Sequence, residues 1–201
     1  MTDQDLQLFN EYFQLEHRVN VNITLGGDWS TLPSDEAFDR SIPVPYKIAS
    51  EMKGMEQTML RPLRQLGDVI EPLANYLKAQ SRKIDLMMSY ILQSEDETGD
   101  QYTTFSYGGG GFTFYTDKPW QIDQWFTCKL FFDDEATAVF CLSKLVSCED
   151  KSEEDEVKYL NTMVFRKIRE EDRESIVRAS LHQQSKQLLK KTQSKSLNQD
   201  T

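Results

Sequence analysis

Apolar residues recur every seven positions between about Lys47 and Ser94, and this pattern restricts the fold more than any other feature of the sequence. Two such series in constant phase are typical of the a and d positions of a coiled-coil seam. The predicted seam consists of Met52, Met59, Leu63, Leu66, Ile70, Leu73, Leu77, Gln80, Ile84, Met87 and Ile91. We therefore expect residues 47–95 to form a long heptad-patterned helix that mediates oligomerisation.

The length of this helix indicates what covers its apolar stripe. For one or two heptads, an amphipathic helix lying on its own globular core would be the better interpretation. The pattern here stays in phase for about five heptads, and a helix of roughly 70 Å is longer than a small domain can cover. The sequence therefore predicts that the stripe packs against other copies of the chain.

The residues beside the seam indicate how many helices assemble. Apolar residues occupy several e or g positions, where a two-stranded coiled coil normally carries charges. We therefore expect a tetramer, with a trimer as the second choice. Gln80 is the one polar d residue of the seam, and such a residue can fix the helix register at some cost in stability. The flanking apolar residues are Leu60, Val69, Ala74, Tyr76, Met88 and Tyr90.

Two prolines leave the continuity of this helix open. Pro62 and Pro72 lack a backbone donor and would each cost about 3 kcal/mol in a helix interior. The stretch from Asp68 to Pro72 has the pattern of a helix start, with Asp68 as N-cap and Glu71 in a capping box. The heptad phase nevertheless passes Gly67 without a slip, which favours a kinked but continuous path over two helices.

Strand patterns lie on both sides of the heptad region. Residues 9–26 alternate apolar and polar at Val19, Val21, Ile23 and Leu25, which predicts a first strand. Residues 27–46 contain Gly, Ser, Asp and three Pro without a sustained period, which predicts a connecting loop. Five runs rich in Thr, Phe, Tyr and Val follow and predict an antiparallel sheet or barrel. They are QYTTFSY, GGFTFYT, QWFTCKLFF, ATAVFCLSKLV and VKYLNTMVF.

The chain should end in a helix from about Glu170 to Lys191, followed by a polar tail over residues 192–201 that we expect to be disordered. The narrow apolar stripe of this helix consists of Ile176, Val177, Leu181, Leu188 and Leu189.

Composition excludes several classes of function. The net charge of −10 argues against binding of a nucleic acid polymer, because phosphate binding requires a basic face. The N-terminus carries acids where a secretory signal would be basic, and no apolar run approaches the roughly 18 residues of a membrane span, so we expect a cytoplasmic protein. Cys128, Cys141 and Cys148 lack metal-site or disulfide spacing. No nucleophile with its base, paired carboxylates or metal set is recognisable, so we expect neither a cofactor nor enzymatic activity.

The stretch from Tyr159 to Lys191 resembles the last strand and C-terminal helix of PilZ domains. The glycine-rich turn at residues 108–111 supports this resemblance. The resemblance covers residues 9–26 and 98–191. It implies a mainly β fold with long helices (α+β): a small antiparallel β-barrel interrupted after its first strand by the heptad helix. This organisation resembles a PilZ subgroup whose long heptad-bearing helices build a tetramer.

PilZ domains bind cyclic di-GMP through a [D/N]xSxxG motif and an RxxxR motif, and both are half kept in this sequence. Thr104, Ser106 and Gly109 match the first motif with Thr in place of Asp or Asn, while Gln14 and Arg18 match the second with Gln in place of Arg. The resemblance implies that these five residues form a degenerate cyclic di-GMP site. Losing two charge-assisted contacts at about 1.5–3 kcal/mol each would weaken binding by roughly two to four decades.

Two functions remain open at this point. The chain could be an oligomeric regulatory protein in bacterial cyclic di-GMP signalling that binds the ligand weakly. It could instead be an adaptor that has lost the ligand and binds an unknown regulatory protein. The motif residues also have structural explanations: Arg18 is typical of a solvated strand edge, and Ser106 and Gly109 are typical of a tight turn.

Overall fold

The computed structural model describes most of the chain, in two compact units. The described residues are 3–26, 32–52, 71–94, 100–135, 137–153, 156 and 158–197. Unit 1 comprises Met1–Arg18, Thr103–Gln124 and Ser143–Thr201, and unit 2 comprises Val19–Tyr102 and Trp125–Leu142.

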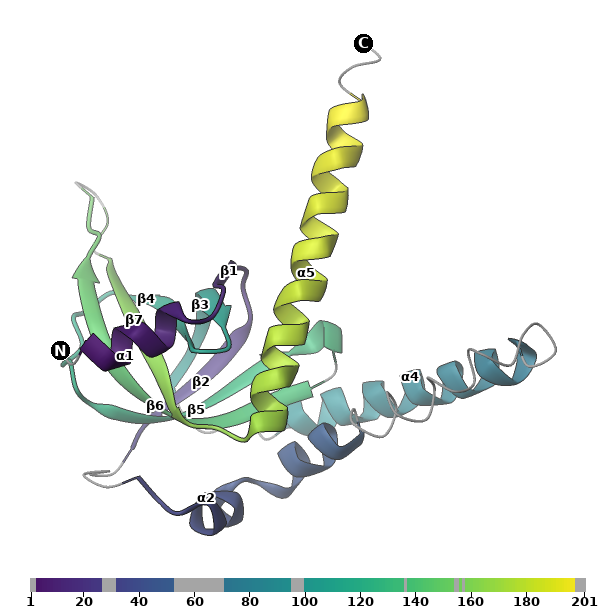
Figure 1. Cartoon of the computed structure of the whole chain (residues 1–201), viewed down its shortest axis with the longest axis horizontal. Helices are drawn as coiled ribbons and strands as arrows, with labels where there is room; N and C mark the ends of the chain where they lie inside the picture. Colours follow the sequence, from purple (N-terminus) through teal and green to yellow (C-terminus); the bar gives the residue numbers. More distant parts are fainter. Residues whose placement is uncertain are drawn as a thin grey trace. The chain divides into compact units, whose positions relative to one another are not determined.

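The strands form one seven-stranded sheet in the order β1-β3-β2-β5-β6-β7-β4. An additional pairing of β3 with β4 closes strands β2 to β7 into an antiparallel β-barrel (Figure 1). The prediction of an α+β fold built on an antiparallel barrel is confirmed. The bounds are β1 Leu15–Glu16, β2 Asn20–Leu25, β3 Asp100–Gly108, β4 Gly111–Thr116, β5 Trp125–Phe132, β6 Thr137–Asp150 and β7 Tyr159–Lys167.

Strand β2 departs from the expected alternation. It pairs with β5 in antiparallel register, and Val21 and Ile23 are buried as expected. Leu25, which was expected on the same face, is 64% exposed, and Asn22 is buried. The apolar face thus ends before Leu25, although Gly26 N still donates to Trp125 O at 2.8 Å and continues the ladder.

Unit 2 contains helices where the sequence predicted a loop over residues 27–46, and that prediction was wrong. Helix α2 covers Asp35–Ser41, and residues 44–52 are also helical. Ser34 caps α2, because its Oγ accepts a hydrogen bond from Ala37 N at 3.3 Å. A three- to four-residue apolar spacing from Phe38 through Ile42 and Tyr46 was present but short, and the prolines masked it.

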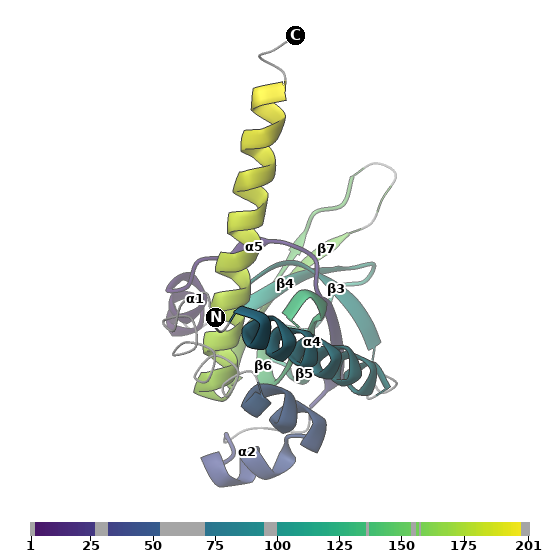
Figure 2. The same ribbon diagram turned by 90° about the vertical axis from the view of Figure 1, so that its right-hand side faces the viewer.

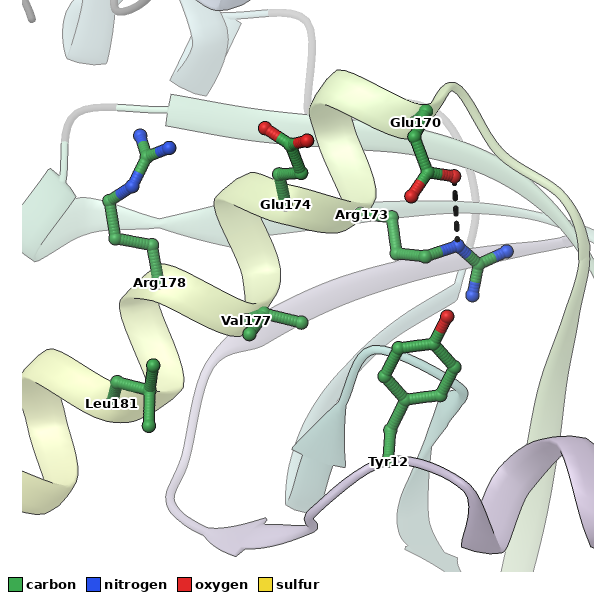
Figure 3. Close-up of a pocket in the computed structure, with 7 residues that line it drawn as sticks. All are labelled: Tyr12, Glu170, Arg173, Glu174, Val177, Arg178 and Leu181. Atoms are coloured by element: carbon green, nitrogen blue, oxygen red, sulfur yellow. Dashed lines mark ion pairs between the residues drawn. The ribbon is translucent and has the colours of Figure 1, made fainter.

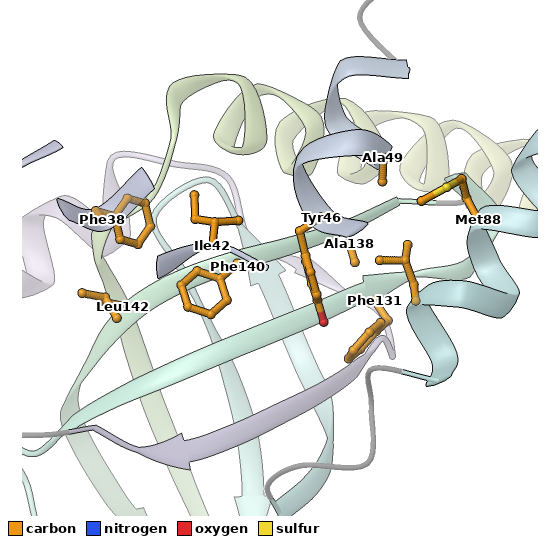
Figure 4. Close-up of a cluster of buried hydrophobic side chains, with 10 residues drawn as sticks. Phe38, Ile42, Tyr46, Ala49, Met88, Phe131, Ala138, Phe140 and Leu142 are labelled. Carbon is orange, nitrogen blue, oxygen red and sulfur yellow. The ribbon is translucent and has the colours of Figure 1, made fainter. Parts of the chain in front are cut away.

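These helices and α4 (Glu71–Ser94) share a buried cluster with strands β5 and β6 (Figure 4). Tyr46 is fully buried there, with ring centroids 6.2 Å from Phe131 and 6.3 Å from Phe140. Met88 and Leu92 hold the C-terminal part of α4 against the cluster, beside the helix over residues 44–52 (Figure 2). Met52, expected in the oligomer seam, instead packs against this cluster.

Only part of the heptad region is described. Helix α4 is described from Glu71 onward and contains Pro72. The predicted seam residues Met59, Leu63, Leu66 and Ile70 lie outside the described residues, as does the question of continuity through Gly67.

In unit 1, helix α1 (Asp3–Asn10) packs against β7, with Phe9 buried against Val146 and Val164 (Figure 1). Helix α5 spans Glu170–Leu197, so residues 192–197, expected to be disordered, continue the helix. The buried face of α5 consists of Asp172, Ile176, Ala179 and Ser180.

A buried carboxylate ties α1 to the barrel. The Asp5 side chain is 3% exposed and forms ion pairs with Arg166 and Lys144, the latter at 3.4 Å. Lys144 also pairs with Asp123 at 2.7 Å, where the carboxylate is 60% exposed. The hydrogen bond from Lys144 lowers the pKa of Asp123, and the same bond raises the pKa of Lys144. The two acids thus share one lysine in different environments, and Asp5 is the buried one.

Replacing Asp5 by Asn should destabilise the protein strongly. The change leaves two cations beside a neutral, buried group, which costs about 3 kcal/mol and lowers the Tm by roughly 5–10 °C. Asp123→Asn is the matched control, since it removes the other, exposed partner of Lys144 and should cost under about 1 kcal/mol. Thermal unfolding followed by circular dichroism at fixed protein concentration measures both, and equal shifts would contradict the prediction.

Candidate nucleotide-binding site

The glycine turn between β3 and β4 lies directly beneath an N-terminal segment, residues 8–14. A Cβ on Gly109 would overlap the ring of Tyr12. A Cβ on Gly110 would lie 2.6 Å from Leu8 O and 2.9 Å from the Cα of Phe9. Only glycine permits the two backbones to approach this closely, so the position of the N-terminal segment requires glycine at 109 and 110.

The two half-kept motifs lie side by side. Strand β1 pairs antiparallel with β3, with Leu15 opposite Tyr107 and Glu16 opposite Ser106. Residues 14–18 therefore run along the strand that carries residues 104–109. This register places the two motifs next to each other.

Gln14 and Arg18 are placed differently with respect to solvent. Gln14 is partly buried, and its Nε2 donates to Phe9 O at 3.4 Å. Its Oε1 is buried and has no hydrogen-bond partner among the described residues. Arg18 is exposed. The amide is therefore directed into the N-terminal segment, while the guanidinium faces solvent.

The polar side chains on β3 are used inside the protein. Thr104 is 1% exposed, and its Oγ1 donates to His17 O at 2.9 Å. The Oγ atoms of Ser106 and Thr113 lie 2.8 Å apart, and Ser106 N donates to Thr113 Oγ1 at 3.2 Å. A register shift between Thr104 and Ser106 accompanies this arrangement. Both hydroxyls thus stabilise the barrel in the absence of a ligand.

Two residues that the sequence analysis did not select complete the site. Arg173 on α5 donates from Nη1 to Gly109 O, and its Cζ lies 5.4 Å from the centroid of the Tyr12 ring. Its Nε is 3.6 Å from a carboxylate oxygen of Glu170 (Figure 3). No local signal distinguishes Arg173 from the other charged residues of EEDRES, because its partners are far away in the sequence.

A hollow of about 420 Å³ adjoins this contact (Figure 3). Its lining combines one aromatic and two aliphatic side chains with two cations and two carboxylates. These residues are Tyr12, Glu170, Arg173, Glu174, Val177, Arg178 and Leu181. Such a surface can accommodate a flat or apolar group and offers both donors and acceptors at its rim.

Comparison with known proteins addresses the fold. No protein-family model matches the sequence, and no curated protein matches it. A solved structure, a tetrameric PilZ-domain protein from Xanthomonas campestris, is similar with a TM-score of 0.50 and 14% identity, over 90% of this chain and 94% of that chain. The chain has a PilZ-like fold.

Two further solved structures are less similar to this chain. The inhibitor of motility from Bacillus subtilis (MotI/DgrA) has a TM-score of 0.46 and 7% identity over 88% of this chain and 51% of that chain. MrkH from K. pneumonia in its apo state has a TM-score of 0.35 and 12% identity over 48% of this chain and 43% of that chain. The chain thus spans about half the length of each of these two proteins.

The described residues also bear on metal binding and on membrane insertion. Within that part of the chain, no group of three or more His, Cys, Asp or Glu is arranged to hold a metal ion. None of the described helices is long and apolar enough to cross a membrane.

The contact of Thr104 with His17 predicts how the half-kept motif can be restored. Thr104→Asp would set a buried carboxylate against a carbonyl oxygen, and the protein should lose about 2 kcal/mol of unfolding free energy. Thr104→Asn supplies an amide donor for the same carbonyl and should cost less than half as much. Thermal unfolding of the two variants measures the difference, and equal stability would contradict the structural role of Thr104.

Proposed function

We propose that this chain is a non-enzymatic, cytoplasmic regulatory protein of cyclic di-GMP signalling, which self-assembles and binds the nucleotide weakly. In this proposal, residues 47–95 are an oligomerisation insert in a PilZ-like barrel. The observation that carries it is the exposed apolar face of α4.

This face consists of the seam positions predicted from the heptads. Of these, Met87 is 65% exposed and Leu73 is 52% exposed. Large apolar side chains in such a continuous row are rare on the surface of a monomer, and self-association is the usual reason for them. The seam residues of α4 are Leu73, Leu77, Gln80, Ile84, Met87 and Ile91, and all but the partly buried Gln80 are exposed.

The opposite side of α4 supports the same proposal. Met88, expected at a flanking position of the seam, is buried in the core cluster of unit 2 together with Leu92. The exposed stripe therefore widens on the g side only, through Tyr76 and Tyr90. A stripe of a, d and g positions suits more than two helices, so we retain the tetramer with the trimer as alternative. The similar structure from Xanthomonas campestris is described as a tetramer self-assembled through a helical bundle.

The ligand part of the proposal rests on the adjacency of the two motifs and on exposed Arg18. A guanidinium at this position can pair with phosphate or stack on a base. One observation favours the second candidate, a protein adaptor without the ligand. The side chains of Gln14, Thr104 and Ser106 already make internal hydrogen bonds, so a ligand would have to compete for them.

Charges placed in the seam should dissociate the assembly. Leu77→Asp combined with Ile84→Asp buries like charges in successive layers, and light scattering should show a monomer at micromolar concentration. Leu86→Asp is the matched control, because Leu86 is 66% exposed but lies at a c position outside the stripe. A double variant that keeps the mass of the native particle would show that α4 is not the interface.

Restoring both motifs should strengthen ligand binding. Gln14→Arg adds a charge and a planar fork, and Thr104→Asn adds the amide that the motif expects. Calorimetric titration with cyclic di-GMP should show at least a tenfold gain over the native chain, since the charged contact that Gln14→Arg adds contributes about 1.5–3 kcal/mol. A folded, assembled double variant that releases no heat at high micromolar ligand would favour the adaptor.

A further inference from the structure

Tyr12 occupies a place that a ligand ring could take. Its ring lies against Gly109, where a Cβ would overlap it, and Arg173 lies over the ring with Cζ 5.4 Å from the centroid. The Arg173 guanidinium also donates to Gly109 O. This hydrogen bond therefore joins Gly109 and Arg173, the two residues whose surfaces contact the ring. Neither Gly109 nor Arg173 can receive another ring while Tyr12 remains there.

The two surfaces have the chemistry of a binding slot for a planar ring. A residue without Cβ lets a flat ring approach the backbone. A guanidinium stacks on ring faces and attracts their π electrons. The Arg173 side chain is 15% exposed, so its position is constrained by the surrounding protein.

The surroundings indicate which ring would fit. The hollow of about 420 Å³ beside Tyr12 gives space for a ring larger than a phenol. Its cations, Arg173 and Arg178, suit a phosphate, and its carboxylates, Glu170 and Glu174, can accept hydrogen bonds from ring N–H and amino groups. Guanine carries such donors on one edge, and its nucleotides carry the phosphate.

We propose that Gly109 and Arg173 form a slot for a guanine base, and that Tyr12 fills this slot in the free protein and must leave before the base binds. The assignment of the base to cyclic di-GMP rests on the proposed function. Tyr12 is then a built-in competitor that weakens ligand binding, in addition to the changes at Gln14 and Thr104.

The test compares variants of the full chain by calorimetry with cyclic di-GMP. Tyr12→Ala removes the competing ring and should tighten binding at least tenfold. Tyr12→Phe keeps the ring and is the control, with affinity unchanged within about twofold. Adding Arg173→Lys to Tyr12→Ala keeps the charge but removes the stacking plane, and it should abolish the gain. Where the parent chain binds cyclic di-GMP, no gain in a folded Tyr12→Ala chain would overturn the slot.

A second substitution covers the case in which Tyr12→Ala does not fold. Tyr12→Leu fills the apolar space above the turn but leaves no ring for Arg173 to stack on. It should also bind cyclic di-GMP more tightly than Tyr12→Phe. Equal affinities of the Leu and Phe variants would count against the proposal.

A second probe separates this proposal from the proposed function. Each Tyr12 variant is also made with Gln14→Arg and Thr104→Asn and titrated with guanosine monophosphate. If the restored chain binds cyclic di-GMP and Tyr12→Ala adds nothing, the slot is wrong and the proposed function stands. If no chain binds cyclic di-GMP but Tyr12→Ala binds guanosine monophosphate and Tyr12→Phe does not, the slot stands and the proposed ligand is wrong. If neither probe binds any variant, both are wrong.

Discussion

The close approach of the N-terminal segment to the glycine turn is the constraint on which the site depends. Gly109 and Gly110 allow the backbone of residues 8–14 to cross the β3–β4 turn without a side chain between them. Because the segment crosses the turn in this way, β1 can pair with β3, and the ring of Tyr12 lies against Arg173. Asp5, which is buried and paired with Arg166 and Lys144, fixes helix α1, which leads into this segment, to the barrel. A substitution at the turn would therefore disturb both motifs at once.

Helix α4 carries apolar residues on two sides, one buried in the core of the chain and one exposed. Its C-terminal part buries Met88 and Leu92 in the chain's own core, and its a and d positions other than the partly buried Gln80 remain exposed. The buried residues anchor the helix, so the exposed stripe is presented by a helix that is already attached. An attached helix loses less conformational freedom on assembly than a disordered segment would, which favours self-association through this face.

The periodicity of apolar residues predicted most of the strands and helices of this fold. The site residues that it missed are brought together by contacts between distant parts of the sequence. The five strand runs after residue 98 and the heptad phase of α4 were evident because each repeats one spacing over many residues. Helix α2 was missed because its apolar spacing covers few residues and lies between prolines. The half-kept motifs were found through the resemblance to PilZ domains, but Tyr12 and Arg173 were not, since a tyrosine and an arginine far apart in the sequence carry no pattern. Their relation depends on the barrel bringing α5 and the N-terminal segment to the same turn.

Under the proposed function, the internal contacts of the motif residues give a cause of weak affinity beyond the two substitutions. A ligand that recruits Thr104 or Ser106 must replace hydrogen bonds that the folded protein already makes, and each is worth about 1 kcal/mol net. A base against Gly109 must in addition displace the ring of Tyr12 and its contact with Arg173. The folded chain therefore already satisfies the groups that a ligand would need, and in the proposed function the affinity for the nucleotide is the difference between two sets of contacts. In the proposed site, Tyr12→Ala therefore removes contacts that compete with the ligand, whereas the motif substitutions add contacts to the ligand itself.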